Sequence, residues 1–224
     1  MILKKYVCLL TAALAIQIGT IQAQQNPVKL NLGSFEGNKG SWTEVGKVWA
    51  NPVIPNELQS ASGAGIMANL PTKKTHGADI ISTDKFGDVD LSLEYMVAPG
   101  SNSGVYLQGN YEIQILDSWT TTNTKPGDNG GIYQRWDESK PDGQKGYQGY
   151  APRQNASKAP GVWQKLEVSF QAAKFDASGN KIENARFLFI KLNGVTIHEN
   201  VEVFGPTRGA MSGKDVAEGP LRIQ

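Results

Sequence analysis

Apolar and polar residues alternate over short segments along most of the chain, and the segments end in clusters of Gly, Pro, Asn and Asp. A period of two is typical of β-strands with one buried face, and few stretches show the 3.6-residue period of an amphipathic helix. The pattern predicts strands at 28–33, 45–50, 64–70, 78–83, 89–97, 102–108, 111–117, 130–135, 162–170, 186–192, 195–203 and 220–224. Many short antiparallel strands without crossover helices indicate an all-β fold, a jelly-roll β-sandwich of two antiparallel sheets.

The region 102–117 is predicted to form a β-hairpin that carries chemistry. Gly109-Asn110 separates two runs rich in β-branched and aromatic residues, which is typical of a two-residue turn. Such a turn directs Tyr106 and Gln108 to the core, and it places Glu112 and Gln114 side by side on the opposite face, about 7 Å apart. A turn longer by one residue would change the cross-strand partners but keep Glu112 and Gln114 together.

A second carboxylate comes from the preceding segment 91–97, where apolar residues at odd positions alternate with Ser92, Glu94 and Met96. Glu94 is therefore expected to point away from the core. If this strand neighbours the hairpin, Glu94 and Glu112 lie about 5 Å apart and raise each other's proton affinity. The alternation alone favours two solvated carboxylates on an exposed face.

The first 23 residues read as a secretory signal peptide. Lys4 and Lys5 precede an apolar run from 6 to 18, and the segment ends in the small residue Ala23. The run is too short for a good membrane span, so the mature chain is expected to have none and to be secreted or periplasmic. Cys8 is the only cysteine, so the mature chain is expected to lack thiols and disulfides.

Length and composition indicate that residues 24–224 form a single domain. A chain of 224 residues with 39% hydrophobic residues, 25 glycines and 11 prolines suits one sizeable all-β domain better than two small ones. Removal of Lys4 and Lys5 leaves 20 basic against 21 acidic residues. A balance so close to zero attracts neither nucleic acid nor acidic lipid, and no nucleic-acid partner is expected.

The segment 119–161 is a long insertion rich in Gly, Asp, Lys and Gln, with Trp and Tyr interspersed. Loops of this length are usually functional or disordered, and the aromatics favour a folded lid that could stack on a sugar. Those aromatics could equally anchor the loop to the body. His76 and His198 form no cluster with metal-ligand spacing, although a divalent metal ion bound by carboxylates remains possible.

Several short motifs resemble a known family. They are Asn-Ser-Gly-Val-Tyr-Leu and Tyr-Glu-Ile-Gln-Ile-Leu-Asp within 102–117, Gly-Gly-Ile-Tyr at 130–133, Ala-Pro at 151–152, Lys-Ala-Pro-Gly-Val-Trp-Gln at 158–164, Leu-Asn-Gly-Val at 192–195 and Gly-Pro-Leu-Arg-Ile-Gln at 219–224. Together, over roughly residues 30–224, they resemble the 3-keto-disaccharide hydrolase family. The resemblance implies a concanavalin A-like jelly roll, and a secreted or periplasmic hydrolase or lyase acting on oxidised disaccharides or glycosides.

The resemblance also implies a reaction. A ketone at C3 of a sugar acidifies the C2 proton, a carboxylate removes it, the glycosidic oxygen at C1 leaves by β-elimination, and water then adds to the product. Glu112 is the predicted catalytic carboxylate, as base or metal ligand, and Glu94 the second. The predicted substrate contacts are Gln114, Gln108, Tyr133, Arg135 and Arg153.

One departure and two alternatives accompany this interpretation. Family members continue after Gly-Pro-Leu-Arg-Ile-Gln with an Asp-His-Gly segment and a final strand, so a C-terminal strand is expected to be missing after Gln224. A conventional retaining glycosidase would use Glu94 and Glu112 at about 5–5.5 Å, although the Glu-x-Asp-x-x-Glu strand of laminarinase-like jelly rolls is not found. A non-catalytic carbohydrate-binding module would instead show a flat row of Trp and Tyr without clustered carboxylates.

Overall fold

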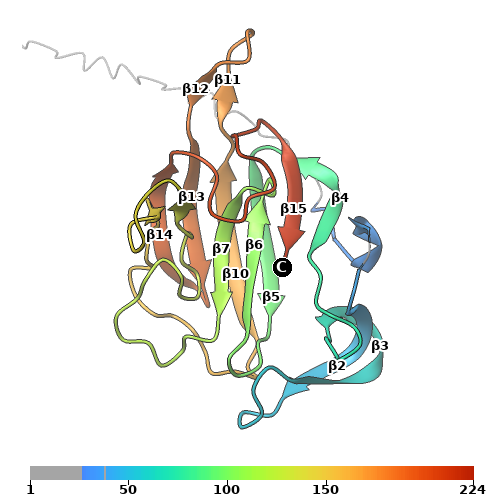
Figure 1. Ribbon diagram of the computed structural model, residues 1–224. Helices are drawn as coiled ribbons and strands as arrows, with labels where there is room; N and C mark the ends of the chain where they lie inside the picture. Colours follow the sequence, from blue (N-terminus) through green and yellow to red (C-terminus); the bar gives the residue numbers. More distant parts are fainter. Residues whose placement is uncertain (1–26, 38) are drawn as a thin grey trace, which may run out of the picture.

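The computed structural model describes residues 27–37 and 39–224, which are almost all β (Figure 1). The predicted signal peptide 1–23, with Cys8, lies outside the described residues. Within them, no helix is long and apolar enough to cross a membrane. The one regular helical element described is a single 3₁₀ turn, η1 (Leu32–Ser34).

Two antiparallel sheets form a sandwich, as predicted. The first sheet has the order β1 (Phe35–Glu36), β4 (Ile80–Phe86), β15 (Gly219–Ile223), β6 (Asn102–Leu107) and β7 (Tyr111–Leu116). The second has the order β14 (Val195–Val203), β13 (Ala185–Leu192), β10 (Gln164–Gln171) and β5 (Val89–Tyr95). Three hairpins stand apart: β2 (Trp42–Ala50) with β3 (Leu58–Asn69), β8 (Arg135–Trp136) with β9 (Gly146–Tyr147), and β11 (Lys174–Phe175) with β12 (Lys181–Glu183).

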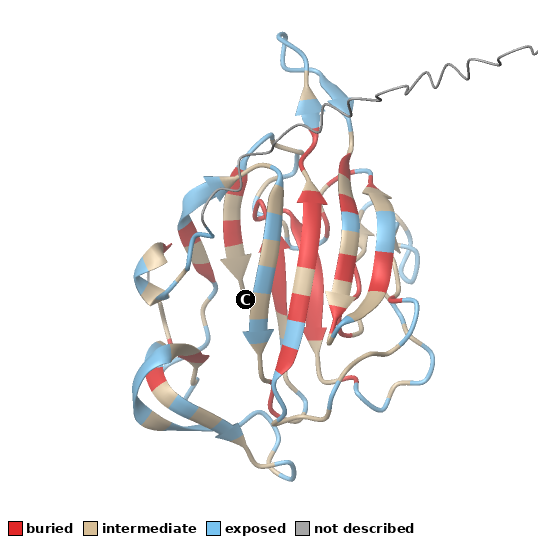
Figure 2. Ribbon diagram, turned by 180° about the vertical axis from the view of Figure 1, so that it is seen from behind, coloured by how far each residue is buried: buried red, intermediate tan, exposed pale blue. Residues whose placement is uncertain are grey.

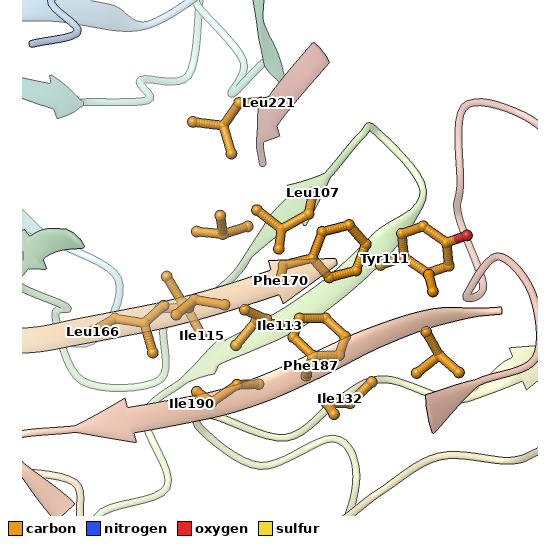
Figure 3. Close-up of a cluster of buried hydrophobic side chains, with 14 of the residues drawn as sticks. Leu107, Tyr111, Ile113, Ile115, Ile132, Leu166, Phe170, Phe187, Ile190 and Leu221 are labelled. Atoms are coloured by element: carbon orange, nitrogen blue, oxygen red, sulfur yellow. The ribbon is translucent and has the colours of Figure 1, made fainter. Parts of the chain in front are cut away.

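The core fills the space between the two sheets. Figure 2 looks onto the second sheet and shows buried residues alternating with more exposed ones along its strands, the pattern of a half-buried sheet. Phe170 of β10 lies 5.3 Å from Tyr111 and 5.1 Å from Phe187, measured between ring centroids. Figure 3 shows these rings among Leu and Ile side chains from both sheets. Each sheet therefore keeps its second face for solvent, loops or a site.

Most predicted strands are present, and β14 has the predicted bounds 195–203. The predicted strand at 28–33 is wrong. There the Asn31 side chain accepts a hydrogen bond from the Gly33 backbone N–H at 2.8 Å and caps η1. A short polar side chain that satisfies a free N–H favours a helical turn over an extended strand.

The turn between β6 and β7 is one residue longer than predicted. Leu107 pairs with Tyr111 and Tyr106 with Glu112, so Gln108, Gly109 and Asn110 form the turn. Gln108 and Gly109 have φ of 54° and 66°. Tyr106 therefore lies on the face of Glu112 and not in the core, which corrects the predicted register.

Residues 204–218, which connect β14 to β15 and are called the strap below, hold this turn in place. The Asn110 amide group donates to the Lys214 carbonyl at 3.1 Å and accepts from the Ser212 N–H at 3.0 Å. The Thr207 N–H donates to the Asn110 carbonyl at 2.9 Å. In Figure 1 the orange-red strap passes in front of the green β6 and β7.

The insertion is folded, as predicted, and it extends the first sheet. Ile132 forms antiparallel bridges with Ile113 of β7 and with Tyr150. The Tyr150 hydroxyl donates to the Glu202 carbonyl at 3.0 Å, so this aromatic anchors the insertion to β14. The side edge of β7 is thereby covered, and residues 130–133 lie directly beside Glu112 and Gln114.

Candidate functional site

Three side chains form a row across the outer face of the first sheet. Arg222 of β15 pairs with Tyr106 of β6, and Tyr106 pairs with Glu112 of β7. Directly opposed residues of antiparallel strands point to the same face. The Tyr133 N–H donates to the Glu112 carbonyl at 3.0 Å, which places Tyr133 next to the row at its far end. Three segments far apart in sequence thus meet around one carboxylate.

Glu112 is buried in this row. Glu112 is only 3% exposed. The alternative considered from the sequence, a solvated carboxylate on an exposed face, is therefore wrong for Glu112. Gly104, on the neighbouring strand, provides the space, because a Cβ at this position would overlap Glu112 Oε1. The Glu112 backbone N–H donates to Thr207 Oγ1 at 3.1 Å, so the strap fixes the strand beneath the carboxylate.

The surroundings make Glu112 a carboxylate that titrates near neutral pH. Burial raises its pKa to about 7, against the opposing effects of a hydrogen bond from Tyr106 and the Arg222 charge, and the Asp79 charge raises it further. Burial, and then the charge of Glu112, raise the pKa of Tyr106, which therefore keeps its hydroxyl proton. A proton acceptor and a proton donor lie side by side.

Arg222 is held by three groups. Its guanidinium lies 3.9 Å over the Tyr106 ring, and Nη1 donates to the Gly209 carbonyl at 2.7 Å. Nε lies 2.9 Å from Asp79 Oδ2, but its N–H has no aligned acceptor, so this contact is an ion pair and not a hydrogen bond. Arg222, Tyr106 and Asp79 were not among the site residues predicted from the sequence. The alternation of Leu221, Arg222 and Ile223 could have placed Arg222 on the outer face.

Gln114 shares the face of Glu112, as the hairpin parity predicts, but its amide is already engaged. Nε2 donates to Asn102 Oδ1 at 2.6 Å and to the Ser103 carbonyl at 3.1 Å, and the residue is 4% exposed. Gln114 therefore braces β6 against β7. Its predicted role as a direct substrate contact has no support from this geometry.

Three of the predicted substrate contacts lie away from the row. Gln108 is buried in the hairpin turn, where Nε2 donates to the Phe86 and Ala217 carbonyls at 3.2 and 3.0 Å. Arg153 is exposed near β14 and forms an ion pair with Glu199 at 3.2 Å. Arg135 donates to Gln148 Oε1 at 2.8 Å and lies 5.1 Å from the Tyr147 ring centroid.

Glu94 and Glu112 do not form a pair, which corrects the expectation of neighbouring strands. Glu94 lies on β5 in the second sheet, directly opposite Lys165 of β10, and it is exposed. Its neighbour Leu93 packs on the core, so Glu94 points to the outer face of that sheet. The two carboxylates thus lie on opposite outer faces of the sandwich, and they cannot flank one glycosidic bond.

No metal site is evident in the described part of the chain, where no three His, Cys, Asp or Glu side chains converge. His198 is 3% exposed and its Nε2 lies 3.0 Å from the Gly130 carbonyl oxygen. Burial lowers the pKa of His198 to about 4, so it is neutral and holds the insertion to β14. A metal ion at carboxylates stays a prediction.

A large hollow lies elsewhere on the molecule. It has a volume of about 1250 Å³ between the β2–β3 hairpin and the edge of β5, with Trp42, Leu93 and Trp163 in its lining. Asp79 and Asn102, which contact Arg222 and Gln114, border it, but Glu112 does not. The chemistry of the row, and not the size of a hollow, marks the candidate site.

The shifted pKa of Glu112 predicts a pH dependence of stability. A carboxyl group whose pKa rises on folding, here from 4.5 to about 7, binds more protons in the folded state between these values. Folding stability from this group is therefore present below pH 4.5 and lost as the pH rises to 7. Urea unfolding gives the free energy of unfolding of Glu112→Gln relative to the wild type. This difference should shift in favour of the variant by up to about 3 kcal/mol between pH 5 and pH 8. If the difference in unfolding free energy between variant and wild type were the same at both pH values, the raised pKa of the buried Glu112 would be contradicted.

Comparison with known proteins places this chain in a family. Residues 31–224 match the sequence model of the 3-keto-alpha-glucoside-1,2-lyase-like domain. The chain belongs to this family. No curated protein matches the chain. The membership supports a carbohydrate-active function.

One solved structure shares the fold of this lyase-like domain. A Parabacteroides distasonis protein described as a candidate glycosyl hydrolase is 24% identical, with a TM-score of 0.54 over 85% of this chain and 74% of that one. A second such protein from the same organism is 18% identical, with a TM-score of 0.48 over 87% of this chain and 86% of that one. The first likeness supports the shared fold alone.

Proposed function

We propose that this lyase-like domain cleaves 3-keto-glycosides by proton abstraction at C2, with Glu112 as the base. The observation that carries the proposal is a buried carboxylate with a pKa of about 7, set beside a protonated tyrosine and an arginine. A base with a pKa near the working pH combines a large ionised fraction with useful basicity. An ordinary exposed glutamate would be a much weaker base.

The proposed steps balance without a redox partner. The Glu112 carboxylate takes the C2 proton, and the electron pair moves to the C3 oxygen as an enolate. The enolate re-forms the ketone, a C1–C2 double bond forms, and the bond from C1 to the glycosidic oxygen breaks. The Tyr106 hydroxyl protonates the departing oxygen, and the proton now on Glu112 restores Tyr106. Addition of water across the C1–C2 bond then yields the 3-keto sugar.

Arg222 contributes charge. Its guanidinium lies over the Tyr106 ring, and its charge lowers the pKa of Glu112, so it lies close enough to stabilise negative charge in this row. A cation preorganised near a developing enolate lowers the barrier without reorganising at the moment of reaction. The ion pair with Asp79 and the bond to Gly209 hold the guanidinium in place.

The family membership and the placement of Glu94 favour this reaction over a conventional glycosidase. The predicted pair of carboxylates is separated by the sandwich. The near-neutral pKa of Glu112 suits removal of a carbon-bound proton made acidic by a ketone. A retaining glycosidase needs two carboxylates. Elimination from a 3-keto-glycoside needs only one, because the ketone makes the C2 proton acidic enough for a single base to remove.

The test compares a 3-keto-glucoside with its unoxidised parent, with and without a chelator, while the conjugated enone is followed by absorbance. We expect cleavage of the ketone form alone, with kcat/KM rising through an apparent pKa near 7 as Glu112 ionises. Deuterium at C2 should slow a rate-limiting abstraction. Cleavage of the parent alone would favour a conventional glycosidase, and binding without turnover would favour a carbohydrate-binding module.

A further inference from the structure

The strap passes directly over the row and links it to the insertion. Thr207 Oγ1 accepts from the Glu112 N–H, and the Gly209 carbonyl accepts from Arg222. Between them, the Arg208 N–H donates to the Gln134 carbonyl at 2.8 Å. The backbone of residues 207–209 is therefore fixed at both ends beside the candidate base. In Figure 1 the strap lies next to the yellow β8–β9 hairpin.

The side chain of Arg208 is held by stacking on Trp136, within electrostatic reach of the Glu138 carboxylate. Its guanidinium lies 3.7 Å over the Trp136 ring, and Arg208 is exposed. Trp136 is itself oriented, because its indole N–H donates to Glu138 Oε1 at 2.7 Å. Glu138 forms its ion pair with Lys145 at 3.0 Å. Within the described residues, the Arg208 guanidinium donates no hydrogen bond, so its donor edge is free.

The position of Arg208 suits the second half of a glycoside. Tyr133 bonds to the Glu112 backbone, and Trp136 lies three residues further along, about 10 Å at the rise of an extended chain. A guanidinium fixed on an aromatic face presents paired donors in one plane, which matches two neighbouring oxygen atoms. Neighbouring hydroxyls of a sugar ring offer such a pair.

We propose that Arg208, supported by Trp136, binds the leaving-group sugar of the substrate through its vicinal hydroxyls. The inference rests on the proposed function, and it assigns the contact with the leaving-group half of a disaccharide substrate to Arg208. Arg208 was not among the predicted site residues, because its stacking partner is supplied by the insertion.

The test compares two ketone substrates, a 3-keto-disaccharide and a 3-keto methyl glucoside. Arg208→Ala should raise KM for the disaccharide about tenfold, the effect of losing one charged hydrogen bond, and should leave the methyl glucoside unchanged. Arg208→Lys, which lacks the planar fork, should restore little of the affinity. An equal effect on both substrates, or none on either, would overturn the proposal.

A binding measurement separates this proposal from the reaction itself. Glu112→Gln protein is titrated with the unoxidised disaccharide and with methyl glucoside, and chemical shifts are followed by NMR, with and without Arg208→Ala. If Arg208→Ala weakens binding of the disaccharide but not of methyl glucoside, the subsite is supported, even when no ketone substrate is turned over. Absence of turnover would reject only the proposed function. Equal binding with and without Arg208 rejects the subsite. Matching melting temperatures establish that the variants are folded.

Discussion

Glu112→Gln is expected to lower kcat for a 3-keto-glycoside by about a thousandfold, because general-base catalysis contributes roughly 10²- to 10⁴-fold. The amide has nearly the shape of the carboxylate and fills the same space beside Gly104, but it cannot accept a proton. Initial rates at pH 8, where the wild-type carboxylate is largely ionised, provide the measurement. KM should change much less than kcat, because the amide preserves the shape of the site.

Glu94→Gln is the matched control for this substitution. It makes the same chemical change on the opposite outer face of the sandwich, at an exposed position paired with Lys165 in the sheet register. Its kcat should stay within twofold of the wild type, a limit set by the small effect of exposed charges. Comparable losses in both variants would point to a general effect of charge and would remove Glu112 from its assigned role.

The sequence predicts the fold and part of the site because both depend on alternation. Glu112 and Gln114 share a face whatever the length of the turn, since they are two residues apart on one strand. The strand at 195–203 and the two-sheet sandwich follow from the same local pattern.

The pairing between segments far apart in the sequence could not be predicted from the alternation of apolar and polar residues. The turn is three residues long because Asn110 bonds to Ser212 and Lys214, about a hundred positions later in the chain. Glu94 joins the second sheet because β5 pairs with β10 and not with β6. Neither partner leaves a signal in the local pattern, so the position of Tyr106 and the separation of Glu94 from Glu112 emerge only from the assembled fold.

Burial was the second property hidden from the sequence. The insertion covers the side edge of β7, and the strap contacts Arg222 and the Glu112 backbone. Glu112 is 3% exposed although it lies on the face away from the core. Burial is also the main cause of its raised pKa. The feature that makes this carboxylate a suitable base thus depends on two connections whose positions no strand pattern specifies.

Gly104→Ala should lower kcat about a hundredfold by displacing the Glu112 carboxylate. The added Cβ would overlap Glu112 Oε1, and a shift of about 1 Å from a productive geometry costs on the order of 10² in rate. Gly104 lies in β6, outside the positive-φ glycines, so alanine fits its backbone and the strain falls on the carboxylate. Overpacking should also reduce the unfolding free energy by about 1–3 kcal/mol.

Two comparisons isolate the steric effect of Gly104→Ala. Gly213→Ala in the strap adds the same methyl group where nothing lies within 4 Å, and it should leave both rate and stability unchanged. In a Glu112→Gln background, Gly104→Ala should cause little further loss of rate, because the base it displaces is already gone and coupled sites are not additive. Full activity of the single Gly104→Ala variant would show that the carboxylate need not lie where the structure places it. Independent losses in the double variant would show that Gly104 acts through some other group.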